Sequence, residues 1–376
     1  MYVQYTSPVG YTILRSGSKI LLHRGWDVLF LGVRARGNAD EIAPDQEHGL
    51  KVCTLAVPPL GWLLRLHYLR FVFWTALKML AFRPRVVYGS EPFSAMPLWI
   101  AKILLRARII YHEHDPPQVS GAEPASPVVM WLRNAAVRAA DLCIVPGEVR
   151  AAAFKHQYAQ ANVRSVWNVV DADEILSRRT ARQPNTDLVL WYHGAIVASQ
   201  LPLALIEALQ KVRRARLVFA GPSPVGQVQY LAEFLNAADA GGISDRVRYL
   251  GVIPDRNVML GHMQNADVGL CLFRTPFRAP MVGASQKVFE YLAGGLALLT
   301  PSTQEWIDFV KPNNIGLTCD TACFSDLSKT LETILDDLRC LTSMHENAIL
   351  LVRNQWNYQL LFQPVVDWME APSARH

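Results

Sequence analysis

Short apolar runs alternate with longer segments in which apolar residues recur every three or four positions, and this alternation repeats along most of the chain. The pattern is typical of parallel sheets whose strands are joined by crossover helices. In the first half, strands are expected at residues 2–5, 28–33, 52–57, 86–88, 108–111 and 142–145. Helices are expected between them at residues 13–24, 63–82, 96–105 and 127–139.

The same rhythm starts again after residues 171–187, a polar and charged stretch that is typical of a linker. Strands are expected there at residues 188–192, 215–220, 247–250, 268–272, 297–300 and 316–318. Helices are expected at residues 203–212, 227–240, 257–265, 286–293 and 324–338. The pattern therefore predicts two doubly wound α/β domains. A last helix is expected over residues 354–370, and Pro364 would kink or divide it.

Composition excludes disorder, because 51% of the 376 residues are hydrophobic and only 18% are charged. The length exceeds what one core usually supports, which agrees with two domains. The mean hydropathy of +0.12 raises the question of a membrane span. The longest uncharged run, residues 188–206, includes His193, Gly194, Ser199, Gln200 and Pro202, so a strand, a loop and a helix start explain it better. Neither a membrane span nor a signal peptide is expected.

Charge is distributed unevenly between the two halves. Residues 1–167 contain 19 lysines and arginines against 11 acidic residues, a net charge of +8, whereas the remainder nets −3. The segment 62–82 combines six aromatic residues with Arg65, Arg70 and Lys78. Two interpretations stay open: a core helix with a few solvated cations, or an interfacial helix that binds an anionic lipid surface. No nucleic-acid-binding motif accompanies the basic residues, so no nucleic-acid partner is predicted.

Ligands of doubly wound sheets bind in the loops that follow the strands. Gly10 follows the first expected strand, and Gly194 follows the first strand of the second half. A glycine in such a loop allows a phosphate to approach the backbone, although a plain turn explains it equally well. No GxGxxG motif is present, which argues against an NAD or FAD site.

The segment Y-H-E-H-D, residues 111–115, gathers polar side chains at another strand end. His112, His114 and Asp115 are candidates for hydrogen bonds to a hydroxylated ligand or for acid–base chemistry. Glu91, after the preceding strand, is a further candidate contact for a sugar or acceptor. A metal site and a structural turn are the alternatives. No metal site is predicted, because no second His or Cys cluster accompanies this segment.

The most specific loop is residues 283–300, G-A-S-Q-K-V-F-E-Y-L-A-G-G-L-A-L-L-T. Gly283 and Ser285 lead into a helix whose one face carries Lys287 and, three residues on, Glu290. A surface ion pair would explain this pair of residues. A nucleoside diphosphate explains it better, because a helix N-terminus attracts phosphate and a carboxylate accepts hydrogen bonds from ribose hydroxyls.

In this order and spacing, the segments resemble glycosyltransferase family 4 of the GT-B glycosyltransferases. The resemblance is carried by K-V-F-E-Y-L-A-G-G-L-A-L-L-T together with the loop of Gly10, Y-H-E-H-D, A-D-L-C-I-V-P-G-E, V-W-N-V-V-D, A-D-V-G-L-C-L-F and a last helix entered through Trp356. It implies two Rossmann-like domains that face each other across a cleft. The first would be residues 1–170 joined by residues 354–376, and the second, residues 171–353, would bind the nucleotide.

The resemblance also implies the reaction: retaining transfer from a nucleoside-diphosphate sugar as co-substrate, with no bound metal. Carried over residue by residue, Glu290 binds the donor ribose and His114 lies beside the donor sugar, and these two are the expected catalytic residues. Gly10 lies by the distal phosphate, and Lys287 lies near the phosphate-binding helix.

The sequence departs from the family pattern at two places. The family usually has a glutamate eight residues before the ribose glutamate, where this chain has Val282. The usual Arg and Lys of the second domain's first loop are missing from residues 194–201. We hypothesise that Arg274 and Arg278, just before the signature helix, supply positive charge instead.

Two function classes follow from the resemblance. The first is an active hexosyltransferase that acts on a glycan or lipid-linked acceptor in polysaccharide or glycolipid biosynthesis. It is expected in the cytoplasm and peripherally at the inner face of the membrane. The second is a catalytically weakened homologue that binds a nucleotide sugar or a partner. A sugar epimerase on the same fold is a third, weaker alternative.

Overall fold

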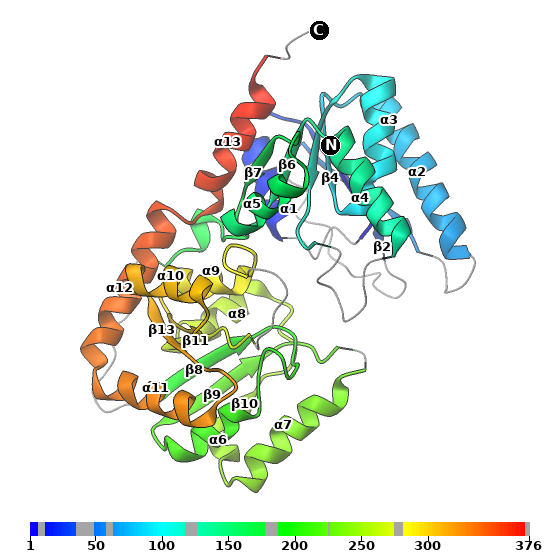
Figure 1. Cartoon of the computed structure of the whole chain (residues 1–376). Helices are drawn as coiled ribbons and strands as arrows, with labels where there is room; N and C mark the ends of the chain where they lie inside the picture. Colours follow the sequence, from blue (N-terminus) through cyan, green and yellow to red (C-terminus); the bar gives the residue numbers. More distant parts are fainter. Residues whose placement is uncertain are drawn as a thin grey trace. The chain divides into compact units, whose positions relative to one another are not determined.

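The computed structural model describes residues 1–6, 12–34, 49–57, 63–116, 126–176, 187–224, 226–273 and 281–372. The chain divides into two compact units (Figure 1). The first comprises Met1–Asn168 and Tyr358–His376, and the second comprises Val169–Asn357. Each unit is an α/β structure built on one parallel sheet, as the alternation of apolar and helical segments predicts.

The first unit contains a seven-stranded sheet in which every strand pair is parallel, in the order β3-β2-β1-β4-β5-β6-β7. Its strands are β1 (Tyr2–Gln4), β2 (Val28–Arg34), β3 (Leu50–Ala56), β4 (Val86–Ser90), β5 (Arg108–His112), β6 (Leu142–Val145) and β7 (Val163–Ser165). Its helices are α1 (Thr12–His23), α2 (Leu63–Phe82), the 3₁₀ turn η2 (Pro92–Ser94), α3 (Ala95–Leu105), α4 (Pro127–Ala139), α5 (Glu148–Gln157) and α13 (Tyr358–Glu370).

Helices cover both faces of this sheet (Figure 1). Helices α2, α3, α4 and α5 share one apolar core with the strands, which includes Phe71, Leu98, Leu132 and Phe154. On the other face α1 packs against α13. Because both faces are covered, β4, β5 and β6 are buried almost throughout, and this explains their nearly continuous apolar sequences.

The second unit contains a six-stranded parallel sheet in the order β10-β9-β8-β11-β12-β13. Its strands are β8 (Leu188–His193), β9 (Ala215–Ala220), β10 (Val247–Tyr249), β11 (Val268–Leu270), β12 (Ala297–Pro301) and β13 (Gly316–Cys319). Its helices are η3 (Ala172–Glu174), α6 (Ala204–Lys211), α7 (Val228–Ala240), η4 (Ser244–Arg246), α8 (Arg256–Met263), α9 (Gln286–Ala293), α10 (Gln304–Asn313), α11 (Phe324–Asp336) and α12 (Leu338–Asn354).

Apolar side chains of α6, α7, α11 and α12 form the core on one face of this sheet. Helix α9 contacts β11 and β12, and its residues Val288–Ala293 are all buried. Helix α8 begins at a capping carboxylate: Asp255 accepts hydrogen bonds from the backbone N–H groups of Asn257 and Val258. The cap fixes where α8 starts and therefore where Arg256, its first residue, lies.

Several elements differ from the sequence-based expectation. Helices α5 and α10, strand β7 and most of α12 were not predicted. In α5 only Arg150 and Phe154 are buried, so the helix has too little apolar periodicity to be recognised. The last helix begins at Tyr358 rather than at residue 354, and Pro364 does not divide it, because α13 continues to Glu370.

Candidate functional site

The strand order of the second unit reverses beside β8, with β9 and β10 on one side and β11, β12 and β13 on the other. In open parallel sheets, ligands bind at the carboxyl ends of the strands at such a reversal point. His193 ends β8 there, and helix α9 follows the loop after the neighbouring β11. These two elements carry the candidate site.

Helix α9 lies close to the sheet because β11 contains a glycine. A Cβ atom on Gly269 would lie 2.4 Å from the ring of Tyr291, so only glycine leaves room for this ring. The hydroxyl of Tyr291 in turn accepts the backbone N–H of His193 across 3.1 Å. The end of β8 and helix α9 are thereby held together.

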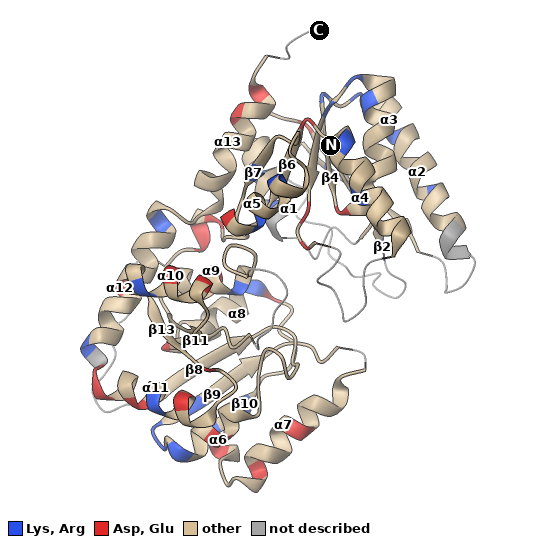
Figure 2. Ribbon diagram, in the orientation of Figure 1, with Lys and Arg blue, Asp and Glu red and all other residues tan. Residues whose placement is uncertain are grey.

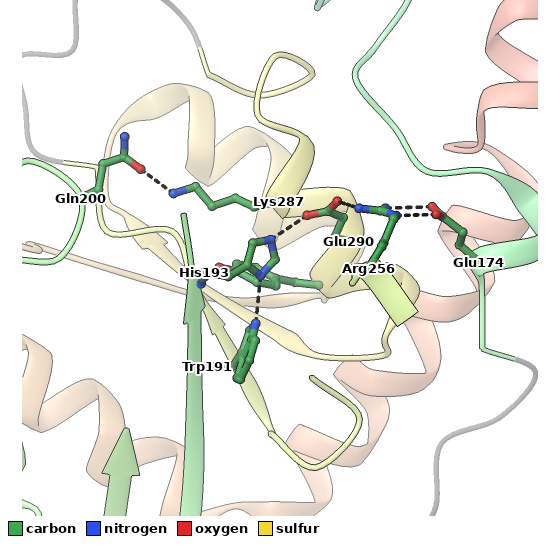
Figure 3. A network of polar contacts seen from close by, with 8 residues as sticks. Glu174, Trp191, His193, Gln200, Arg256, Lys287 and Glu290 are labelled. Carbon is green, nitrogen blue, oxygen red and sulfur yellow. Dashed lines mark hydrogen bonds and ion pairs between the residues drawn. The ribbon is translucent and has the colours of Figure 1, made fainter. Parts of the chain in front are cut away.

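Glu290 is 5% exposed and points toward His193 (Figure 3). Its Oε2 lies 2.6 Å from Nε2 of His193. The indole N–H of Trp191 donates to Nδ1 of the same ring across 2.9 Å, so Nδ1 carries no proton and Nε2 donates to Glu290. His193 is therefore an oriented donor to the carboxylate.

The second oxygen of Glu290 accepts a hydrogen bond from Nη1 of Arg256. Arg256 is itself held by Glu174, whose two carboxylate oxygens accept from Nε and Nη2 of the guanidinium. Burial opposes ionisation of Glu290, but the hydrogen bonds from His193 and Arg256 outweigh it and lower its pKa to about 2. Glu290 is thus ionised at neutral pH, and each oxygen keeps a further lone pair for a ligand hydroxyl.

Lys287 lies one turn before Glu290 on the same helix and points toward Gln200 (Figure 3). Its Nζ donates to Oε1 of Gln200 across 2.6 Å and lies 4.7 Å from the ring centre of Tyr192 and 4.8 Å from that of Phe273. Burial lowers the pKa of Lys287 to about 8. An anion bound beside this ammonium would favour its charged form.

Gly194 and Gly283, two of the glycines expected at this site, lie around the two elements, and Gly221, which was not expected there, lies beside Gly194. Gly194 follows β8 with φ +132°, and a Cβ there would lie 3.6 Å from Nζ of Lys287. Gly221 follows β9 with φ +139°, and a Cβ there would lie only 1.9 Å from the carbonyl oxygen of Gly194. Gly283 has φ +81° in the loop before α9, and Ser285 is the buried N-cap residue of that helix, without a side-chain hydrogen bond to its N–H groups.

Val282 occupies the position where the resemblance leads us to expect a glutamate. Its backbone N–H donates across 2.8 Å to Oε1 of Glu305, near the N-terminus of α10. The carboxylate of Glu305 on α10 therefore contacts this loop, although it accepts a hydrogen bond from the loop backbone and does not replace the expected glutamate side chain.

In the first unit the strand order reverses between β1 and β4. Glu91 directly follows β4 with φ 65° and ψ 163°, a conformation that is essentially restricted to glycine. Backbone hydrogen bonds hold it there: its N–H donates to His112, and its carbonyl accepts from Ser94. Its Oε1 accepts the backbone N–H of His114 across 3.0 Å. Burial and the nearby Glu113 raise the pKa of Glu91 to about 8, so it is mostly protonated at neutral pH.

The two histidines after β5 are buried and uncharged. Burial lowers the pKa of His114 to about 3 and that of His112 well below its usual value. Their ring centres are 3.8 Å apart, and Nδ1 of His112 lies 2.6 Å from the hydroxyl of Tyr88. Between them in sequence, Glu113 forms a buried bidentate pair with Arg133.

The structure brings Glu91, His112 and His114 together in the first unit, and Lys287 and Glu290 in the second. Asp115 also follows β5, but its side chain is largely exposed and contacts only Arg150 among the ion pairs of the described residues. Gly10, Arg274 and Arg278 lie outside the described residues.

Sequence reasoning missed His193 and Arg256 as site residues. His193 stands next to Gly194 in W-Y-H-G, and its position at the end of an apolar strand was the available signal. For Arg256 the sequence offers only its position directly after a capping aspartate. This signal is weak, because 34 residues separate Arg256 from Glu290 and nothing local links the two.

Among the described residues, no three His, Cys, Asp or Glu side chains are grouped so that they could hold a metal ion. The expectation that the reaction needs no metal stays a prediction. Likewise, no helix in the described ranges is both long and apolar enough to cross a bilayer.

Comparison with known proteins is consistent with this architecture. Residues 15–168 match the family model described as glycosyl transferase 4-like domain. No curated protein matches the chain by sequence.

Solved structures match over nearly the whole chain. HepE from Anabaena in complex with UDP is 15% identical with a TM-score of 0.76, and the match covers 98% of both chains. Sucrose-phosphate synthase from Thermosynechococcus elongatus is also 15% identical, with a TM-score of 0.73 and 98% of both chains covered. WaaG, a glycosyltransferase involved in lipopolysaccharide biosynthesis, is 14% identical with a TM-score of 0.68, and the match covers 99% of this chain and 100% of WaaG.

At these identities the similarity concerns the fold. Together with the family match over residues 15–168, it shows that the chain has the fold of the GT-B glycosyltransferases. This supports a glycosyltransferase of the GT-B type.

Proposed function

We propose that the protein transfers a hexose from a nucleoside-diphosphate sugar to a glycan or lipid-linked acceptor, with retention at the anomeric carbon and without a bound metal. The observation that carries the proposal is the buried, ionised carboxylate of Glu290 at the strand-order reversal of the second unit, on the same helix as Lys287. A carboxylate suits the two ribose hydroxyls, and a helix N-terminus with a lysine suits the diphosphate.

UDP is the first nucleotide to test, because the HepE structures hold UDP, UDP with glucose, or UDP-glucose. In the proposed reaction, the bond between the anomeric carbon and the diphosphate oxygen breaks and the acceptor hydroxyl forms the new glycosidic bond. The hydroxyl proton leaves with the diphosphate. Positive charge from Lys287 and the amide dipoles of α9 would stabilise the charge that develops on the leaving group.

In the first unit, His114 and Glu91 are proposed to contact the transferred sugar or the acceptor. Both are uncharged at neutral pH, since His114 has lost its proton and Glu91 retains one. They would therefore act through hydrogen bonds to sugar hydroxyls rather than through charge.

A nucleotide-sugar-binding homologue without transfer activity is the second candidate, and Val282 favours it, because the expected carboxylate is absent there. A thermal-shift screen of the full chain with UDP-, GDP-, ADP- and dTDP-sugars tests donor binding, since only a matched donor stabilises the fold strongly. Stabilisation by none of them would overturn both candidates. Donor hydrolysis or transfer then separates them: turnover supports the transferase, whereas binding without turnover of any donor supports the homologue.

A further inference from the structure

Helix α2 exposes a stripe of large apolar side chains to solvent. Leu66, Leu69, Phe73, Leu77 and Leu80 are each between 49 and 67% exposed. Their spacing of three or four residues places them on one face of the helix. The opposite face is buried against the sheet, where it carries His67, Phe71, Thr75 and Met79.

A surface helix of a globular protein normally presents polar residues on its outer face. Helix α2 instead is apolar on both faces, and its exposed stripe contributes nothing to the core of the unit. Isolated exposed apolar residues need no explanation, but a contiguous apolar surface marks an interaction site.

The next two helices also expose large apolar side chains. Helix α3 contacts both α2 and α4, and the three helices lie on the same flank of the unit (Figure 1). Ile103 and Leu104 on α3 and Val128 and Trp131 on α4 are each at least 60% exposed. Nine of the sixteen exposed large apolar residues of the described chain therefore lie on these three helices, which we call the α2–α4 surface.

Positive charge predominates on this surface, although Lys102 is paired with Asp141, which closely follows α4. Helices α2, α3 and α4 together contain six lysines and arginines and no aspartate or glutamate, and one of the six, Arg133, is buried in its pair with Glu113. Arg83 and Arg106, which directly follow α2 and α3, and Arg85, which precedes β4, are also exposed. Figure 2 shows Lys and Arg but no acidic residue on α2 and α3.

We propose that the α2–α4 surface binds to an anionic lipid bilayer, with its apolar side chains inserted at the headgroup level and its cations against lipid phosphates. Leucine, phenylalanine and tryptophan interleaved with lysine and arginine are the composition of interfacial helices. A protein partner fits less well, because nothing on the three helices supplies the acidic or mixed charges that give such an interface its specificity.

This proposal is independent of the donor site, since every residue that carries it lies on α2, α3 or α4 or within three residues after them. Vesicle binding needs no nucleotide, so its failure leaves the proposed sugar transfer intact, and failure of donor binding leaves the bilayer contact intact.

The test is co-sedimentation of the full chain with vesicles of phosphatidylcholine and phosphatidylglycerol in equal parts, and with phosphatidylcholine alone. The apolar variant is Leu69→Ser with Phe73→Ser and Leu77→Ser, and the charge variant is Arg70→Gln with Arg106→Gln. Matched controls come from the second unit: Val228→Ser with Val252→Ser and Val258→Ser, and Arg213→Gln with Arg214→Gln. All these side chains are exposed, so the fold should tolerate the changes, and circular dichroism checks that it does.

We expect the wild type to bind anionic vesicles and to lose binding at roughly 0.5 M salt. The apolar variant should bind at least about tenfold more weakly, and the charge variant about fivefold more weakly for each charge removed. Both controls should bind like the wild type. Absence of wild-type binding, or equal binding by the apolar variant, would overturn the proposal. A dimer in solution that Leu69→Ser, Phe73→Ser and Leu77→Ser convert to a monomer, without vesicle binding, would assign the surface to a second copy of the chain instead.

Discussion

The Nε2 atom of His193 donates to Oε2 of Glu290 across 2.6 Å, while Trp191 fixes the other ring nitrogen. The imidazole is thereby oriented, and the carboxylate that it binds is fixed before any ligand arrives. A fixed carboxylate loses little conformational entropy when ribose hydroxyls bind, so it suits a recognition site.

Because of the Arg256–Glu290 contact, the free energy of unfolding should depend on pH in the acidic range. The folded-state pKa of Glu290, about 2, lies below its usual value of 4.5, so this group stabilises the fold fully above about pH 4.5 and less as the pH falls toward 2. This difference between the folded-state pKa and the usual pKa of Glu290 corresponds to at most about 3 kcal/mol of the free energy of unfolding. We expect Arg256→Gln to be clearly less stable than the wild type at pH 7, and the difference to shrink as the pH falls below 4.

Urea unfolding between pH 2.5 and 7 measures this difference. Arg216→Gln is the matched control, because its pair with Asp187 is solvent-exposed and contributes at most about 1 kcal/mol. A difference between wild type and Arg256→Gln that stays constant over the whole range would contradict the coupling.

Lys287 should make nucleotide affinity depend on alkaline pH. Burial lowers its pKa to about 8, so the free protein loses this positive charge as the pH rises above 8. We expect the affinity for UDP to fall from pH 7 to 9.5 in the wild type, and to be weaker and nearly independent of pH in Lys287→Met. Calorimetric titration at several pH values measures both, with the exposed Lys311→Met as control. Parallel profiles for wild type and Lys287→Met would show that Lys287 does not contact the phosphates.

Glu91 is expected to lower the stability of the fold and to contribute to activity. Its φ and ψ are those of glycine, which costs a glutamate about 1–3 kcal/mol. We therefore expect Glu91→Gly to raise the free energy of unfolding at pH 7 and to lower kcat/KM about tenfold or more, because a sugar contact is lost. Glu91→Gln is the control that keeps the strain and the acceptor for the N–H of His114. A stabilised Glu91→Gly with full activity would remove Glu91 from the site.

Gly221 should be essential for the loop that carries Gly194. A methyl group on Gly221 would lie 1.9 Å from the carbonyl oxygen of Gly194, so the loop must move. We expect Gly221→Ala to lose about 2–4 kcal/mol of stability in urea unfolding and to weaken UDP binding. Gly226→Ala is the matched control, because Gly226 also has positive φ but no atom within 4 Å of its Cβ position. Equal losses in the two variants would mean that backbone conformation alone, not the contact, explains the cost.

Most of the fold could be predicted from the sequence because the central strands of both sheets are buried on both faces. Strand β8, for example, is apolar from Leu188 to Tyr192, and such a run is visible without any partner. Helix α10 was missed, because its sequence QEWIDFVKPN mixes polar residues with a proline near its end.

The candidate site could be predicted only where its residues are neighbours in sequence. Lys287 and Glu290 share a helix turn, so their pattern is local. Arg256 and Glu174 are 82 residues apart, and only folding of the second unit joins them to Glu290. The strained backbone conformation of Glu91 could not be predicted, because a glutamate that follows a strand usually has an ordinary conformation.

Calorimetric titration of UDP into the full chain and into Glu290→Gln tests the central proposal most directly. Glutamine keeps the size of the side chain but removes the charge and one acceptor oxygen, and the exposed Glu332→Gln of the same unit is the control. We predict that the wild type and Glu332→Gln bind UDP alike, and that Glu290→Gln binds about 10- to 100-fold more weakly. Equal affinity of Glu290→Gln and the wild type would contradict the assignment of Glu290 to the nucleotide site.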